Sequence, residues 1–131
     1  MSFDKPDYST GPSLRTIAMP SDTNANGDMF GGWLLSQMDL AGSLLATQKA
    51  GTRVATVGIE AMSFKKPVFV GDEVSCYCRI DRIGHTSITI HIESWARGRL
   101  LESAHKVTEG KFTYVAIDEH HKPVPVVRDN I

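Results

Sequence analysis

The residues with the clearest chemical potential lie in the segment SDTNANGDMFGGW, residues 21–33, directly before the longest apolar segment of the chain. The segment begins like a calcium-binding loop, with Asp22, Asn24 and Asn26 at positions one, three and five. Position twelve of such a loop supplies a bidentate carboxylate, and here that position is Trp33. The spacing therefore argues against a calcium site.

A turn that caps a helix is a second interpretation of the same segment. Asp, Asn and Gly are common turn residues, and Asp28 near a helix start would interact favourably with the helix dipole. This interpretation leaves Gly31 and Gly32 unexplained, because glycine costs helix stability. A third interpretation uses the glycines: unpaired N–H groups at a helix start bind an anion or oxyanion, and glycine lets a carbonyl approach them closely.

An oxyanion site needs an acid or base within reach, and Asp39 is the candidate. On a helical wheel Asp39 lies between Leu35 and Gly42, at the margin of the apolar face. We expect Gly42 to leave open space beside the carboxylate. The alternative is an ordinary exposed aspartate on a helix surface.

Other catalytic chemistry fits the sequence poorly. No serine lies in a G-x-S-x-G motif, and the five histidines do not have the spacing of metal ligands, so we predict no metal site. His91 falls on the outward face of its strand, where we expect an exposed side chain. Cys76 and Cys78, two residues apart on one strand, are expected to be reduced and packed.

Size and composition indicate one globular domain. The chain has 131 residues, a formal net charge of −1, 41% hydrophobic and 22% charged residues, which gives no reason to expect binding to nucleic acid or to a membrane surface. No apolar run is long enough to span a bilayer and the start lacks the features of a signal peptide, so a cytoplasmic location is predicted. We expect a flexible arm over 1–12, the domain over 13–119 and an extended tail over 120–131.

The elements that position these residues are one long helix followed by strands. Apolar residues recur at helical spacing from Gly31 or Gly32 until Gly51, and such an apolar helix must be largely buried. Alternating and β-branched segments predict strands over 14–20, 53–64, 73–80, 86–96 and 102–118, with hairpin connections near 82–85 and 96–101. This order predicts an α+β fold in which a curved antiparallel sheet wraps around the helix, completed by edge-to-edge dimerisation.

Several segments together resemble a known family. MPSDTNANGDMFGGWLLSQMDLAGSLLA, FKKPVFVGDEV and GHTSITIHIESW are similar to the YciA-type bacterial acyl-CoA thioesterases of the hotdog-fold superfamily, and the similarity runs from about Leu14 to Asp118. The resemblance implies a single hotdog domain that pairs as a double-hotdog homodimer, commonly with three dimers in a hexamer. It also implies hydrolysis of short- to medium-chain acyl-CoAs to free acid and CoA.

The resemblance assigns roles to residues of the opening segment and the helix. Asp39 matches the catalytic aspartate, as general base or as nucleophile, and Asn24 matches an asparagine that works opposite the aspartate of a partner domain or subunit. The backbone N–H groups of Phe30, Gly31 and Gly32 match the site that binds the thioester carbonyl. No cofactor is implied, because CoA is part of the substrate. A non-catalytic acyl-CoA or fatty-acid binding module on the same fold is the alternative.

Two further groups of residues are expected to contact the substrate. The phosphates of CoA call for basic groups, and the resemblance adds hydrogen-bond donors on one hairpin; the candidates are Lys65, Lys66, Arg82, His85, Thr86 and Ser87. The acyl pocket is expected to include Leu35, Met38 and Phe64.

Overall fold

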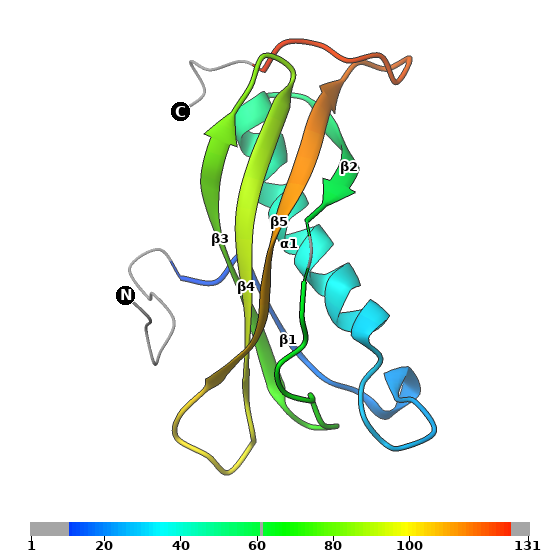
Figure 1. The fold of residues 1–131 in the computed structure, drawn as a ribbon, viewed down its shortest axis with the longest axis vertical. Helices are drawn as coiled ribbons and strands as arrows, with labels where there is room; N and C mark the ends of the chain where they lie inside the picture. The colour runs from blue at the N-terminus through cyan, green and yellow to red at the C-terminus, as the bar shows by residue number, and fades with distance from the viewer. Residues whose placement is uncertain (1–10, 61, 127–131) are drawn as a thin grey trace.

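The computed structural model of the protein describes residues 11–60 and 62–126 (Figure 1). It contains one long helix and five strands, with a short 3-10 helix at Pro20–Asp22. The elements are β1 (Leu14–Ile17), α1 (Gly31–Ala50), β2 (Arg53–Ile59), β3 (Glu73–Ile83), β4 (Ser87–Arg97) and β5 (His105–Ile117).

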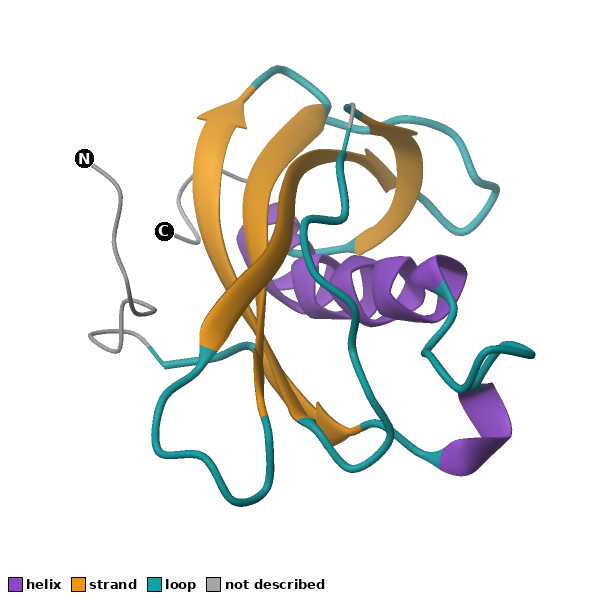
Figure 2. Ribbon diagram, turned by 60° about the horizontal axis from the view of Figure 1, so that its bottom comes forward, coloured by secondary structure: helices purple, strands orange, loops and turns teal. Residues whose placement is uncertain are grey.

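The five strands form one antiparallel sheet in the order β1-β3-β4-β5-β2. The sheet curls around α1, so that the helix lies in its concave side (Figure 2). This arrangement confirms the predicted α+β fold with a central helix. Because β2 and β1 are the outermost strands, the sheet is open on both sides rather than closed into a barrel.

Helix α1 begins at Gly31 and ends before Gly51, as the positions of these glycines in the sequence indicated. Phe30 is the N-cap residue, and Gly51 ends the helix in the left-handed conformation with φ of 70°, which glycine adopts without strain. The sheet buries only one side of α1, however: Leu40 and Leu44 are each 54% exposed. The expectation of a largely buried helix is therefore met on one face only, because five strands do not surround it.

Strand β4 lies across the middle of the core. Ile88, Ile90 and Ile92 point toward α1 and are fully buried, as the alternation predicted. The expectation for His91 was wrong: it lies on the opposite sheet face, as predicted, yet only 9% of its surface is exposed. Side chains of neighbouring strands cover it there, including Glu109 of β5.

Several strand boundaries differ from the predicted ones. β2 ends at Ile59 instead of residue 64, although Glu60 and Lys65 still donate backbone hydrogen bonds to β5, and the Met62 side chain occupies the space beside Gly110. β3 continues to Ile83, because its last residues still pair with β4. β5 begins at His105 rather than at residue 102.

The two ends of the domain are described only in part. The predicted arm over 1–12 lies outside the described residues except for its last two, as do the last five residues of the predicted tail. Within the tail, Val124 donates a backbone hydrogen bond to Ala116 at 2.9 Å and Val126 donates one to His85 at 2.9 Å. This part of the tail therefore packs against the ends of the sheet.

The two cysteines are free thiols, as predicted. Cys76 is buried and Cys78 is half-buried, and burial raises the pKa of each thiol to about 11. Neutral thiols of this kind serve as packing groups on β3 rather than as nucleophiles.

Candidate active site

The calcium-like segment folds into a loop that closes on Asn24. The side-chain Oδ1 of Asn24 accepts hydrogen bonds from the backbone N–H groups of Asn26, at 2.9 Å, and Asp28, at 3.2 Å. Its own backbone N–H donates to the carbonyl of Asp28 at 2.7 Å, and Gly27 turns the chain with φ of 83°. The oxygen of the Asn24 side chain is thus committed to the loop, so its Nδ2 amino group is the part that can contact a substrate.

The loop leads directly into the start of α1. The N–H of Phe30 makes a long contact of 3.4 Å with the carbonyl of Asp22. The N–H groups of Gly31 and Gly32 belong to the first helical turn, which has no preceding helical carbonyls to accept from them. A methyl group added to Gly32 would meet no atom within 4 Å, whereas one added to Gly31 would lie 3.5 Å from the ring of Phe64.

A cavity of about 230 Å³ adjoins the helix start. It is mainly apolar and includes Phe64, which was expected in the acyl pocket, and Lys66, which was expected to bind CoA. Met38 is fully buried in the core and Leu35 packs against that core, so neither is among the described lining residues. Those residues are Met29, Phe30, Gly31, Leu34, Phe64, Lys66, Pro67, Val68 and Val107.

The carboxylate of Asp39 is oriented by a residue that the sequence did not point to. Thr56 of β2 donates a hydrogen bond from Oγ1 to Oδ1 of Asp39 at 2.7 Å. The pairing of β2 with β5 shifts register between Thr56 and Gly58, which makes Val57 an extra residue in the edge strand. The glycine directly after this bulge was the available sequence signal for it.

The backbone at Asp39 is fixed from the other side by Tyr114 of β5. The Tyr114 hydroxyl donates to the Asp39 carbonyl oxygen at 2.9 Å. Burial, together with the nearby Asp39 carboxylate, raises the pKa of Tyr114, so the hydroxyl stays protonated and remains a donor.

The space beside Gly42 is not open, contrary to expectation. A Cβ atom at Gly42 would lie 2.2 Å from the Tyr114 hydroxyl oxygen and 2.6 Å from Ile92 Cδ1. Gly42 is therefore needed for the close approach of β5 to α1, and this approach allows Tyr114 to reach Asp39.

One chain does not bring the predicted catalytic groups together. Gly31 and Asp39 are eight residues apart on a continuous helix, which separates them by about 12 Å along its axis. Groups that act on one carbonyl must each lie about 3 Å from the reacting atoms. Along the axis of one helix, the backbone of Asp39 is therefore several times this distance from the helix start.

The predicted CoA-binding residues also separate into two groups. Lys65 lies beside Val107, to whose carbonyl its N–H donates at 2.9 Å, and Lys66 follows it. Ser87 pairs with Val115, so the group formed by Arg82, His85, Thr86 and Ser87 lies about 27 Å further along β5. The first group is near the helix start and the second is at the opposite end of the sheet (Figure 1).

The comparison with protein families decides the class of the chain. A model of the thioesterase superfamily matches residues 26–103, which contain the end of the loop, helix α1 and strands β2, β3 and β4. The chain belongs to the thioesterase superfamily. It is 53% identical over 116 residues to the acyl-CoA thioester hydrolase YciA of Salmonella typhimurium. The aligned region covers 86% of this chain and 87% of the relative.

Solved structures of the same family have the same fold. The hexameric thioesterase y2039 from Yersinia pestis is 50% identical with a TM-score of 0.86, covering 92% of this chain and 98% of that one. HI0827, a hexameric broad specificity acyl-coenzyme A thioesterase, is 42% identical with a TM-score of 0.88, covering 98% of this chain and 90% of that one. The resemblance to the hotdog thioesterases is thereby confirmed, as is the prediction of an enzyme of the acyl-CoA thioester hydrolase class.

Two further observations concern membrane crossing and metal binding. Within residues 11–60 and 62–126, no helix combines the length and apolar character that a membrane crossing requires. In the same residues, the group of side chains that could hold a metal ion is His91, Glu93 and Glu109, and it lies on the sheet face away from α1. Asp39 is not part of that group.

Proposed function

We propose that the protein hydrolyses acyl-CoA thioesters to a free acid and CoA. The names of the similar proteins support this reaction class. The chemistry is supported by a helix start whose first N–H groups have no preceding helical carbonyls, and by a carboxylate held in place by Thr56. None of these groups needs a cofactor, and CoA enters as part of the substrate.

The proposed roles follow from what each group can do. The N–H groups of Gly31 and Gly32 polarise the thioester carbonyl and stabilise the oxyanion, and one such donor is typically worth about 3 kcal/mol. The N–H of Phe30 joins them by giving up its long contact of 3.4 Å with the Asp22 carbonyl. Asp39 acts as general base on water, or attacks the carbonyl and forms an anhydride that water resolves. Asn24 donates from Nδ2 to the carbonyl or the water, because its Oδ1 is used by the loop.

We propose that each site needs two chains. The main support is the separation of Gly31 and Asp39 on one helix, which is about 12 Å along the axis. One chain supplies Asn24 and the helix start, and its neighbour supplies Asp39. The exposed Leu40 and Leu44 on α1 and the outermost position of β2 support an edge-to-edge homodimer. The hexameric similar proteins support assembly of three such dimers.

The same division applies to substrate binding. A CoA that lies along the site would meet Lys65 and Lys66 of one chain and the group from Arg82 to Ser87 of another, because those groups are far apart within one protomer. The apolar cavity that contains Phe64 beside Gly31 supports binding of short- to medium-chain acyl groups next to the carbonyl site. Met38 and Leu35 would then pack behind the residues that line the pocket and would not contact the acyl chain directly.

The decisive test is release of thiol from a panel of acyl-CoAs of different chain length by the purified protein and its Asp39→Asn variant. The variant keeps the shape of Asp39 but loses the charge, so we expect kcat to fall by about 10²–10⁴-fold. CoA binding, measured by calorimetry, should be retained. An unchanged rate in the variant would reject the role of Asp39. Binding of acyl-CoA without turnover by the unaltered protein would instead favour a non-catalytic binding module.

A further inference from the structure

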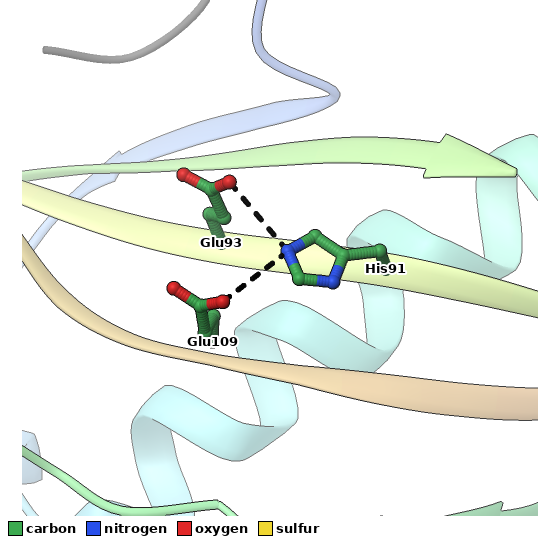
Figure 3. A group of neighbouring side chains, drawn as sticks. All are labelled: His91, Glu93 and Glu109. Atoms are coloured by element: carbon green, nitrogen blue, oxygen red, sulfur yellow. Dashed lines mark ion pairs between the residues drawn. The ribbon is translucent and has the colours of Figure 1, made fainter. Parts of the chain in front are cut away.

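A cluster of three side chains lies on the sheet face that is turned away from α1. His91 and Glu93 alternate with the buried isoleucines of β4, and Glu109 of β5 is directly opposite Glu93 in the strand register. Figure 3 shows the imidazole of His91 pointing between the two carboxylates. The ligand atoms of the three residues all lie within 4.8 Å of one another.

The inner nitrogen of the cluster has no hydrogen bond. His91 is only 9% exposed, and its Nε2 has no hydrogen-bond partner among residues 11–60 and 62–126. Its contacts are the two ion pairs drawn in Figure 3, with Oε2 of Glu93 at 3.5 Å and Oε1 of Glu109 at 3.7 Å, and both are longer than good hydrogen bonds. Burying a polar nitrogen without a partner is unfavourable, so the position calls for an additional group.

The outer oxygens of both carboxylates are held by other residues. Trp95 donates from Nε1 to Oε1 of Glu93 at 2.9 Å, and Lys106 donates from Nζ to Oε2 of Glu109. These contacts leave one oxygen of each glutamate directed at His91 (Figure 3). Hydrogen bonds of this kind orient the ligands of metal sites in proteins.

We propose that His91, Glu93 and Glu109 form a zinc-binding site separate from the thioester site. Around a tetrahedral Zn²⁺ with bonds of about 2.1 Å, two ligand atoms are about 3.4 Å apart. The two separations from His91 Nε2, 3.5 Å and 3.7 Å, are close to that value, and the two carboxylate oxygens lie within 4.8 Å of each other. Three protein ligands leave the fourth position to water. The inference departs from the sequence prediction of no metal site, because Glu109 joins the cluster only through strand pairing.

Two cations moderate the charge of the site. Besides Lys106, Arg79 lies 3.7 Å from Glu93 Oε2 with a side chain that is 67% exposed. They offset part of the carboxylate charge, so zinc affinity in the micromolar range is expected rather than the tighter binding of thiolate sites. His91 and Glu93 border a cavity of about 310 Å³, which provides an entry route for the ion.

The experiment uses the full chain, stripped with a chelator and titrated with Zn²⁺ at neutral pH in a calorimeter. We expect one ion per chain, a higher Tm in the presence of zinc, and loss of both effects in His91→Gln. With Co²⁺ as a spectroscopic substitute, the visible absorption should be that of a four-coordinate ion. Failure of the unaltered chain to bind zinc would overturn the proposal.

Two control variants separate this site from other surface groups. His120 and His121 are neighbouring exposed histidines, so the double variant His120→Ala/His121→Ala should still bind zinc. Glu73→Gln changes a carboxylate of β3 outside the cluster, which pairs with Arg15 and Arg97, and should also leave binding unchanged. Binding that is lost in the double variant, or unchanged in His91→Gln, contradicts the assignment. If His91→Gln fails to fold by circular dichroism, Glu109→Gln replaces it, with an expected loss of at least tenfold in affinity.

Discussion

A carboxylate on the exposed side of a helix has many rotamers, and catalysis needs one of them. In this protein Thr56 restricts the rotamer of Asp39 through a hydrogen bond of 2.7 Å to Oδ1, and in the proposed mechanism Oδ2 acts on water or on the carbonyl. Hydrogen bonds to a charged group contribute about 1.5–3 kcal/mol. Thr56 contacts Asp39 rather than the substrate, so we describe it as a positioning residue.

Replacing Thr56 by valine tests this role, because valine keeps the branched shape and removes the donor. We expect kcat to fall by roughly tenfold to a hundredfold with little change in KM, and Thr56→Ser to restore most of the rate. Steady-state kinetics with one acyl-CoA measures both constants. Thr113→Val is the matched control, because Thr113 pairs with Thr89 on the other sheet face and should keep the full rate. Equal rates for Thr56→Val and the unaltered protein would contradict the role of the hydroxyl.

At the scale of elements, the contact between α1 and β5 depends on one missing side chain. Gly42 allows Tyr114 to approach the helix and to donate to the Asp39 carbonyl. The helix backbone that carries the carboxylate is therefore fixed by the sheet as well as by its own hydrogen bonds.

A methyl group at Gly42 should disturb this contact. Because Tyr114 and Ile92 both lie within 3 Å of the added atom, we expect Gly42→Ala to lower the free energy of unfolding by about 1–3 kcal/mol. Urea denaturation followed by circular dichroism measures the change. Gly32→Ala is the control for stability: it meets open space, so it should leave the free energy unchanged or raise it slightly. A Gly42→Ala protein as stable as the unaltered one would show that the sheet relaxes away from the helix.

The predictability of the elements differs with the kind of signal. The helix and its end at Gly51, and the inward isoleucines of β4, could be predicted because their periodicity and turn chemistry are local. The end of β2 and the burial of His91 could not, because they depend on the position of Met62 beside Gly110 and on the neighbouring strand β5.

For the candidate site, the sequence indicated the chemical groups that could act on a substrate, but not the residues that hold those groups in place. Asp39 and the glycines were visible from their places on the helix. Thr56 and Tyr114, which hold Asp39, lie 17 and 75 residues away in the chain, and only the strand register brings them there. Long-range partners of this kind are invisible to pattern analysis.

At the scale of the whole molecule, the proposed site belongs to a pair of chains. Asn24 and Asp39 of one protomer would act in two different active sites of the dimer, each of which catalyses the same reaction. Two inactive variants can then restore each other, since a mixed dimer contains one site with both residues intact and one with neither.

We therefore expect mixtures of Asn24→Ala and Asp39→Asn chains to recover activity. If equal amounts are unfolded together and refolded, half of the dimers are mixed and half of their sites are complete, which gives about a quarter of the unaltered rate. Each variant refolded alone is the control and should remain inactive. If the mixture has only the average activity of the two variants, both residues act within one chain.

The extra residue in β2 has a second consequence, for solubility. Val57 and Ile59 are exposed on an edge strand, and such an edge is a template on which further strands add to form aggregates. The bulge at Val57 interrupts the regular ladder of the edge, so a flat, unrelated strand pairs with it less well than a strand whose shape matches the bulge. The irregularity beside Thr56 thus disfavours indiscriminate strand addition and leaves the edge to the partner protomer proposed above.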